Sequence, residues 1–199
     1  RDFHTTASFL GEDFEISREG TDGDMDAYTR RLQDLDGKVD AIGLGGTDLY
    51  LVAAGRRYPI RDIRKMVSRV KTTPVLDGSG LKNTLERQAV RWLAEQGLVD
   101  FRTAKTLVVC AVDRFGMAEE VAACGGPVIY GDLMFDVGLP FPIRSFPAVR
   151  VLAKLLLPVI TRLPFKWLYP TGKKQESITP KYGWAYAWAD VIAGDFLLI

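Results

Sequence analysis

Histidine and cysteine are scarce in this chain of 199 residues, which has one histidine, His4, and two cysteines, Cys110 and Cys124. The two cysteines show neither the C-x-x-C spacing of a metal or redox motif nor a disulfide framework, so we expect two reduced thiols. A zinc or other transition-metal site requires a cluster of such ligands. The sequence therefore predicts no metal site, and a Ser-His-Asp or Cys-His mechanism would depend on His4 alone.

An excess of one charge and long apolar runs are also lacking. Lys and Arg together number 26 and Asp and Glu 25, so no overall positive field attracts nucleic acid or an anionic membrane. No run approaches the ~20 apolar residues that span a bilayer, and no signal segment is visible. We expect a cytoplasmic protein without a nucleic-acid partner or a membrane span. The absent initiator methionine leaves open that the chain is truncated and that a further strand precedes Arg1.

The length and the 47% content of hydrophobic residues predict one α/β domain over residues 1–199. Short apolar runs typical of buried strands alternate with amphipathic stretches typical of helices. The expected strands are residues 14–17, 39–46, 74–77, 106–112, 128–130 and 190–194, with 14–17 beside 39–46, and the expected helices are residues 25–35, 63–70, 85–97 and 117–124. This alternation favours a doubly wound, mainly parallel, Rossmann-like sheet, in which ligands bind beyond the carboxyl ends of the strands.

Two segments interrupt the alternation. Residues 49–60 flank Gly55 and predict a β-hairpin insertion. Residues 139–170 are apolar and contain six prolines, which predicts a proline-broken helical insertion within the domain. We expect a kinked helix that packs on the domain, with docking to a membrane surface or to a partner helix as the alternative. Residues 146–169 are the expected contact surface of a homo-oligomer.

The segment D-G-S-G-L-K-N-T at 77–84 follows an expected strand and opens an expected helix. Its glycines permit close backbone approach, and its polar side chains and lysine can meet an anion. The expected cofactor-binding residues here are Gly78, Ser79, Gly80, Asn83 and Thr84. Lys82, paired with Asp77, Asp48 or Asp113, is the expected proton-transfer group. The alternative is an ordinary strand-to-helix turn with a solvated lysine.

A second glycine-rich turn, I-G-L-G-G-T-D at 42–48, predicts a wall of the same site. Its expected ligand contacts are Gly43, Gly45 and Gly46, whereas a plain hairpin or bulge turn is the alternative.

Two acidic residues complete the expected site. Asp132 closes an expected strand where a Rossmann fold holds ribose hydroxyls, and Asp113 also follows a strand. Asp113 can instead cap the helix that begins near Gly116, with Arg114 solvated. Asn83 with Glu86 resembles a capping box.

Several segments together are similar to a known bacterial family. They are G-T-D-G-D at 20–24, V-D-A-I-G-L-G-G-T-D-L-Y-L at 39–51, D-G-S-G-L-K-N-T-L-E-R at 77–87, V-D-R-F-G-M-A-E at 112–119, G-D-L-M-F at 131–135 and W-A-D-V-I-A-G-D-F at 188–196. Along nearly its whole length the chain resembles proteins that automated labels call quinate 5-dehydrogenase. This resemblance implies a Rossmann-like fold, NAD or NADP as cofactor, and oxidation of a ring hydroxyl in quinate or a related cyclic hydroxy acid. In characterised quinate and shikimate dehydrogenases a lysine–aspartate pair holds the substrate, and Lys82 is the closest candidate for that lysine.

Two functions from different classes follow from the sequence. The first is an NAD(P)-dependent dehydrogenase acting on a small cyclic hydroxy acid, with Lys82, Asp77 and Asp113 as its catalytic residues. The second is a non-catalytic domain that binds a nucleotide or phosphorylated metabolite and has a regulatory or interaction role. Lys82 lying beside two carboxylates in a closed cleft would favour the enzyme.

Overall fold

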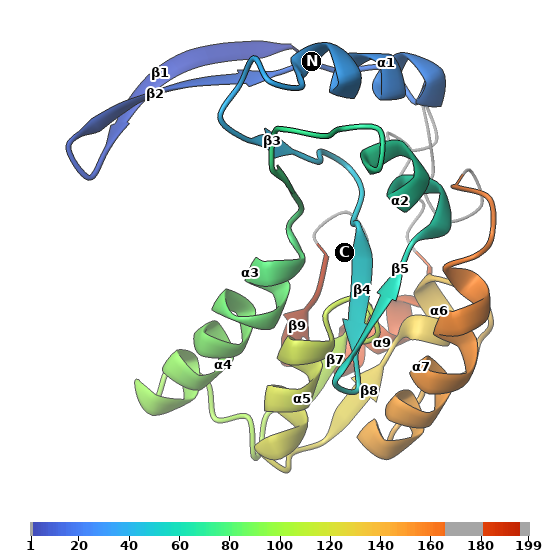
Figure 1. Ribbon diagram of the computed structural model, residues 1–199. Helices are drawn as coiled ribbons and strands as arrows, with labels where there is room; N and C mark the ends of the chain where they lie inside the picture. Colours follow the sequence, from blue (N-terminus) through green and yellow to red (C-terminus); the bar gives the residue numbers. More distant parts are fainter. Residues whose placement is uncertain (1, 166–180, 196–199) are drawn as a thin grey trace.

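The computed structural model describes residues 2–165 and 181–195 (Figure 1). The chain begins with an antiparallel hairpin of β1 (Phe3–Phe9) and β2 (Glu12–Arg18) that projects from the body. Leu10 and Gly11 both have positive φ, 53° and 86°, as the tight turn between two twisted strands requires. Because this turn returns the chain directly, β2 pairs with β1. The predicted pairing of residues 14–17 with 39–46 is therefore wrong.

The next elements begin in the upper part of the molecule in Figure 1, and the β4–β5 hairpin extends from there down into the lower part. They are α1 (Met25–Leu35), β3 (Ile42–Gly43), β4 (Tyr50–Ala53), β5 (Arg56–Pro59), α2 (Arg61–Val67) and β6 (Val75–Leu76). The Asp24 carboxylate caps α1 by accepting hydrogen bonds from the backbone N–H groups of Asp26 and Ala27, both at 2.9 Å. β3 pairs with β6 in parallel, and β4 pairs with β5 as the predicted hairpin.

The remaining elements form the lower part. They are α3 (Ser79–Asn83), α4 (Leu85–Glu95), β7 (Thr106–Val108), α5 (Phe115–Ala123), β8 (Val128–Tyr130), α6 (Asp132–Phe135), α7 (Phe146–Ile160), α9 (Gly183–Trp188) and β9 (Val191–Ala193). β7 lies between β8 and β9 and pairs with both in parallel. The predicted strand–helix–strand unit over residues 106–130 is thus confirmed, although its strands are shorter than expected.

The predicted doubly wound, Rossmann-like sheet is wrong. The described strands form four small sheets, three of two strands and one of three, and two of these are antiparallel hairpins. β3 and β6 are only two residues long, and the chain turns away after β3, where Gly46 has a φ of 74°. The β4–β5 hairpin pairs only within itself, so it does not connect the β3–β6 pair to the β8–β7–β9 sheet. Apolar alternation indicates where each strand lies but not which strands join.

The buried side chains form three clusters. The largest lies between the three-stranded sheet, the β4–β5 hairpin, α5 and α7, and includes Val108, Phe115, Tyr130 and Leu157. A second cluster packs α1 and α2 onto β3. A third packs α6 and α9 against the other face of the three-stranded sheet. These small cores hold the loops that follow the strands, where the polar residues described below converge.

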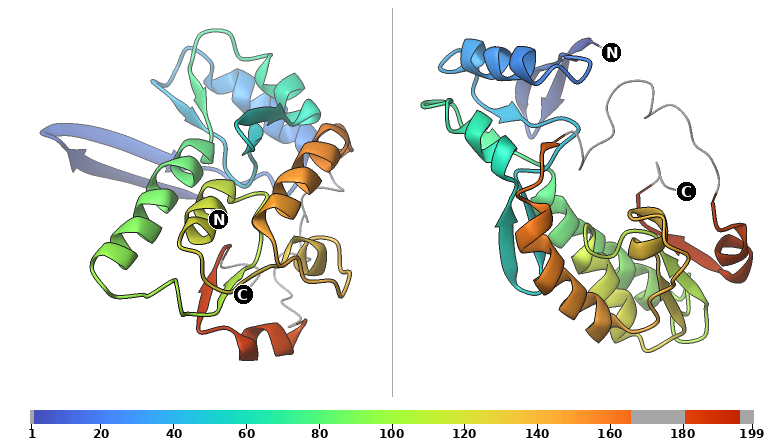
Figure 2. Two further views of the ribbon diagram at one scale, coloured as in Figure 1. Left: turned by 90° about the horizontal axis from the view of Figure 1, so that it is seen from below. Right: turned by 90° about the vertical axis from the view of Figure 1, so that its right-hand side faces the viewer.

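Helix α7 covers the central part of the predicted proline-broken segment. Pro147 lies in its first turn and Pro158 lies inside it, so the segment forms one helix of 15 residues that runs through a proline. Its inner face is buried, whereas Val151, Leu155 and Val159 form an exposed apolar stripe. In Figure 2, α7 is the orange helix. The end of the predicted insertion, residues 166–170, lies outside the described residues. In the described part of the chain, no helix has the length and apolar character needed to cross a membrane.

Candidate functional site

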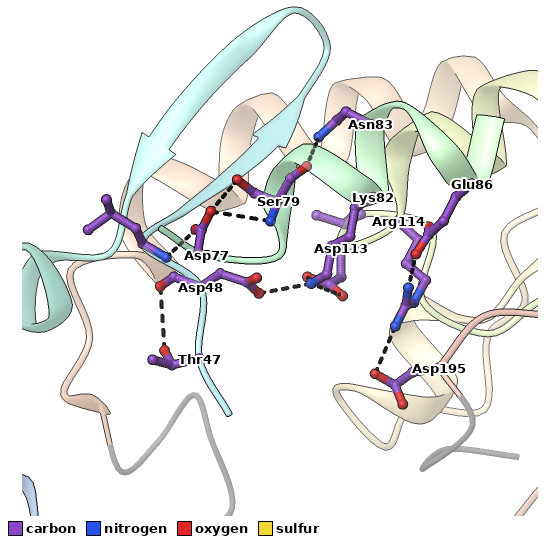
Figure 3. Close-up of polar contacts among 12 residues, drawn as sticks. Thr47, Asp48, Asp77, Ser79, Lys82, Asn83, Glu86, Asp113, Arg114 and Asp195 are labelled. Carbon is purple, nitrogen blue, oxygen red and sulfur yellow. Dashed lines mark hydrogen bonds and ion pairs between the residues drawn. The ribbon is translucent and has the colours of Figure 1, made fainter. Parts of the chain in front are cut away.

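The predicted lysine is held between two carboxylates. Lys82 Nζ donates to Asp48 Oδ2 at 2.8 Å and to both carboxylate oxygens of Asp113, at 2.7 and 2.8 Å (Figure 3). Lys82 lies on α3, Asp48 precedes β4, and Asp113 lies in the loop between β7 and α5. The side chain of Asp48 is 11% exposed and that of Asp113 is 30% exposed. The ammonium is therefore closed on the Asp48 side and open to solvent on the Asp113 side.

Asp77 does not contact Lys82 but holds the neighbouring loops. Its Oδ2 accepts a hydrogen bond from the Leu49 backbone N–H at 2.6 Å, and its Oδ1 accepts from the Ser79 hydroxyl at 2.6 Å. These bonds join the turn before α3 to the loop before β4, and so place Lys82 next to Asp48. The structure gives Asp77 a positioning role rather than a place among the reacting groups.

The charges around Lys82 determine its protonation state. Burial opposes the charged ammonium, but the carboxylates of Asp113 and Asp48 outweigh burial and raise the pKa of Lys82 above its ordinary value. Burial also raises the pKa of Asp48, which the Lys82 ammonium partly offsets. Lys82 is therefore a fixed cation at neutral pH. It can stabilise negative charge but cannot accept a proton.

A second charged group lies beside the first. Arg114 pairs with Glu86 on α4, and its other guanidinium nitrogen donates to Asp195 Oδ2 at 3.1 Å (Figure 3). In the described part of the chain, Glu86 Oε2 and Arg114 Nε are buried and have no hydrogen-bond partner. Each unpaired buried polar atom costs about 1–3 kcal/mol. A polar ligand or water molecules would recover this energy.

Asp132 provides a carboxyl group that can exchange a proton near neutral pH. It is 4% exposed, and burial raises its pKa to about 6. Its Oδ1 accepts a hydrogen bond from the Val112 backbone N–H at 2.7 Å, next to Asp113. Its Oδ2 is buried and has no partner among the described residues.

The residues predicted to hold a cofactor already have other partners. The Asn83 amide donates to the Ser79 carbonyl at 3.0 Å, the Thr84 hydroxyl donates to the Gly80 carbonyl at 2.8 Å, and the Ser79 hydroxyl donates to Asp77. Gly78 precedes α3, which is only five residues long. Gly43 ends β3, while Gly45 and Gly46 are exposed in the turn after it.

These residues do not fit a dinucleotide. A pyrophosphate requires free donors and positive charge, but the turn at 78–84 has bonded donors and faces the carboxylates of Asp48, Asp77 and Asp113, with Lys82 as the nearby cation. The surroundings instead suit a ligand with hydroxyl groups and no phosphate. In the described residues, no group of three or more His, Cys, Asp or Glu side chains is placed to hold a metal ion.

Two local predictions around this site are corrected. Asp113 does not cap α5, whose N-cap residue Arg114 makes no side-chain cap hydrogen bond. Glu86 does not form a capping box with Asn83 because α4 begins after Thr84 and Glu86 pairs with Arg114. Sequence reasoning missed Asp195 and the ion pairs of Arg114. The adjacent opposite charges of Asp113 and Arg114 are the one local signal in the sequence of a charge network at this site.

Comparison with known families divides the chain close to this site. Residues 80–199 match the model of a domain of unknown function, DUF8754. The chain belongs to this family. Residues 1–77 match a second domain of unknown function, DUF8753. Lys82, Asp113 and Asp132 lie in the DUF8754 segment, whereas Asp48 and Asp77 lie in the DUF8753 segment, so the Lys82–Asp48 pair joins the two matched segments. No curated protein and no solved structure matches the chain.

Proposed function

We propose that this protein is an enzyme that binds a polyhydroxylated small molecule at Lys82 and Asp113 and removes a proton from one of its hydroxyl groups. The observation that carries the proposal is the Lys82 ammonium held 2.7–2.8 Å from Asp113 on the open side of the site. A hydroxyl entering there can accept a hydrogen bond from the ammonium and donate one to the carboxylate. Both partners are already held in place by their ion pair, which favours catalysis through preorganised charge.

The proposed chemistry divides the roles among three groups. Lys82 stays charged and stabilises the negative charge that develops on the substrate oxygen as its proton leaves. Asp113 orients the hydroxyl by accepting its hydrogen bond and takes up its proton along that bond. Asp48 holds Lys82 from the buried side and acts as a positioning residue.

The resemblance to quinate 5-dehydrogenase gives this proposal a more specific form. In that form the substrate is quinate or a related cyclic hydroxy acid, and loss of the hydroxyl proton accompanies transfer of hydride to NAD or NADP. The turns predicted to hold such a cofactor do not fit it, so the cofactor has no place in the proton transfer proposed above. That proton transfer depends only on Lys82 and Asp113.

The proposal is tested by ligand-induced thermal stabilisation. A ligand that binds only the folded state stabilises it by about 2.7 kcal/mol at 100 times its dissociation constant. We expect quinate, shikimate or another cyclic polyol to raise the melting temperature, and Asp113→Asn to abolish that rise. Addition of NAD or NADP to the same samples, followed through the absorbance of the reduced cofactor, tests the dehydrogenase form.

A matched control separates binding from folding. Asp190→Asn also changes an aspartate in the lower part of the molecule, but Asp190 accepts a hydrogen bond from the Lys105 backbone N–H rather than contacting Lys82. We expect this variant to keep the ligand-induced rise. If no polyol stabilises the unmodified protein, or if Asp113→Asn responds as strongly, the proposed site is wrong.

A second candidate function is supported by a separate basic groove. A hollow of about 650 Å³ between β5, α2 and the end of α7 is lined by five cationic side chains and no acidic one. Those side chains are Arg57, Arg61, Arg64, Lys65 and Arg162. Its volume is within the range of small-molecule sites, and an anion would relieve the repulsion among the cations. This groove favours the non-catalytic function, in which the protein binds a phosphorylated metabolite.

The groove is tested with inorganic phosphate, pyrophosphate and ADP. We expect thermal stabilisation that increases from phosphate to pyrophosphate and is reduced in Arg64→Gln. Arg69→Gln is the matched control because Arg69 follows α2 but does not line the groove. An equal loss of ligand-induced stabilisation in the two variants would indicate a general charge effect and would rule out the groove as a phosphate site.

A further inference from the structure

The β1–β2 hairpin has one apolar and one polar face. Its register pairs Phe3 with Arg18, Thr5 with Ile16, Ala7 with Phe14 and Phe9 with Glu12, and side chains of such facing residues lie on the same face. The intervening pairs carry His4, Thr6, Ser8, Asp13, Glu15 and Ser17 on the other face. The first face is therefore built of three phenylalanines, an isoleucine and two small residues, with one charge at each end.

This apolar face is open to solvent. Phe3, Phe9, Phe14 and Ile16 are 40–56% exposed, and the rings of Phe9 and Phe14 contact each other with centroids 5.7 Å apart. The hairpin is fixed at its base, where Asp2 accepts a hydrogen bond from the Gly20 N–H and Arg31 pairs with Glu19. Beyond that base it extends away from the body, as Figure 1 and the left view of Figure 2 show.

An isolated two-stranded hairpin is marginally stable in water, and a contiguous exposed apolar face indicates an interaction site. The arrangement of the end charges identifies the partner. The four pairs on the apolar face are symmetric about the central pair Thr6–Glu15, and the two ends each combine a phenylalanine with a charge, Arg18 at the base and Glu12 at the tip. The face is therefore complementary to itself when it is turned end to end.

We infer that the hairpin stacks face to face on the same hairpin of a second copy of this chain, with the strands of the two copies running in opposite directions. A two-fold axis across the middle of the hairpin then places Arg18 opposite the partner's Glu12 and Phe3 opposite the partner's Phe9. In the centre, Ile16 meets the partner's Phe14, and the small Thr5 and Ala7 face each other across the interface. Such a self-complementary surface is what an isologous dimer requires.

The two end charges cannot satisfy each other within one chain. Arg18 and Glu12 lie at opposite ends of β2, six residues apart, which is about 20 Å along an extended strand. A face-to-face copy brings both charges within reach of an opposite charge. The exposed α7 stripe offers no comparable pair of end charges, because its apolar residues are flanked by Arg150 and Lys154.

The first experiment measures the mass of the protein in solution by light scattering and sedimentation. We expect a dimer at concentrations of about 10–100 µM and a shift to monomer, by at least tenfold in the dissociation constant, in Phe14→Ser. Ser17→Ala on the polar face is the control and should leave the dimer unchanged. Both positions are exposed, so circular dichroism should show an intact fold in each variant.

A charge exchange tests the orientation of the two copies. Arg18→Glu alone and Glu12→Arg alone each place like charges opposite one another and should weaken the dimer several-fold. A mixture of these two variants should form a heterodimer, and the double variant R18E/E12R should dimerise like the unmodified chain. A monomer at every concentration overturns the inference. A dimer that persists in Phe14→Ser also overturns it. If that dimer is lost in Leu155→Ser, the interface lies on α7 instead.

Discussion

Lys82 Nζ and Asp48 Oδ2 lie 2.8 Å apart and join the segments that match two different family models. The pair is more enclosed than the neighbouring Lys82–Asp113 pair, since Asp48 is 11% exposed and Asp113 is 30% exposed. The two contacts of the Lys82 ammonium can thus have different functions. The inner contact holds the site together, and the outer contact remains accessible to a substrate.

Replacing Lys82 with Met should destabilise the fold by about 2–4 kcal/mol, because it removes the ammonium that faces the buried Asp48 carboxylate. The double variant K82M/D48N should regain part of this loss, since the buried negative charge of Asp48 is then removed as well. Chemical denaturation measures the free energy of unfolding of each variant. Lys38→Met at an exposed position is the control. If the double variant is as unstable as K82M, the Lys82–Asp48 contact contributes no coupling free energy to folding.

Asp132 should make stability depend on pH. Its carboxyl has a pKa of about 6 in the folded state and about 3.9 in an unfolded chain. Between these values the folded state holds more protons, so the contribution of Asp132 to the free energy of unfolding falls as pH rises from about 4 to about 6. Above that range ionised Asp132 costs about 2–3 kcal/mol, at 1.36 kcal/mol for each pKa unit.

The Asp132→Asn variant checks this directly. Its stability should exceed that of the unmodified protein by an amount that grows through the same pH range and is constant above it, measured by urea denaturation at a series of pH values. A stability difference that does not change with pH would show that Asp132 titrates normally in the folded protein.

The approximate positions of α1, α2, α4 and α5 and of the β4–β5 hairpin could be predicted from the sequence because both patterns are local. Met25 to Leu35 repeats with helical spacing, and the residues around Gly55 alternate on both sides of a turn. Sheet assembly is not local, so a two-residue strand such as β3 carries no information about its neighbours. The continuous sheet edge that the glycine-rich turns would share therefore does not exist.

The candidate site could be predicted in part. Lys82 meets Asp113 and Asp48, two of the three carboxylates that the sequence offers it as partners. The pairing of Arg114 with both Glu86 and Asp195 could not be predicted, because it joins positions separated by 28 and 81 residues. Long-range ion pairs of this kind leave no periodic pattern in a single sequence.

The two glycines Gly126 and Gly43 should differ sharply in their tolerance of a methyl group. A Cβ atom at Gly126 would overlap the Phe101 carbonyl oxygen, whereas one at Gly43 would meet nothing within 4 Å. Gly126→Ala should therefore destabilise the fold by about 2 kcal/mol or more through forced backbone movement, and Gly43→Ala by less than about 1 kcal/mol. Thermal melting of the two variants measures this difference. Equal losses would contradict the close approach of the chain before β8 to Phe101.

The two cysteines should react with iodoacetamide at different rates in the folded protein. Cys110 is 3% exposed, and burial together with the nearby Asp113 and Asp136 carboxylates raises the pKa of its thiol, which leaves very little reactive thiolate. Burial raises the pKa of Cys124 as well, but this residue is only partly buried at the end of α5. We expect Cys124 to be modified first and Cys110 only as the protein unfolds, with both modified rapidly in denaturant. Mass spectrometry of peptides taken over time resolves the two sites, and rapid labelling of Cys110 in the native protein would show that the loop carrying Asp113 opens readily.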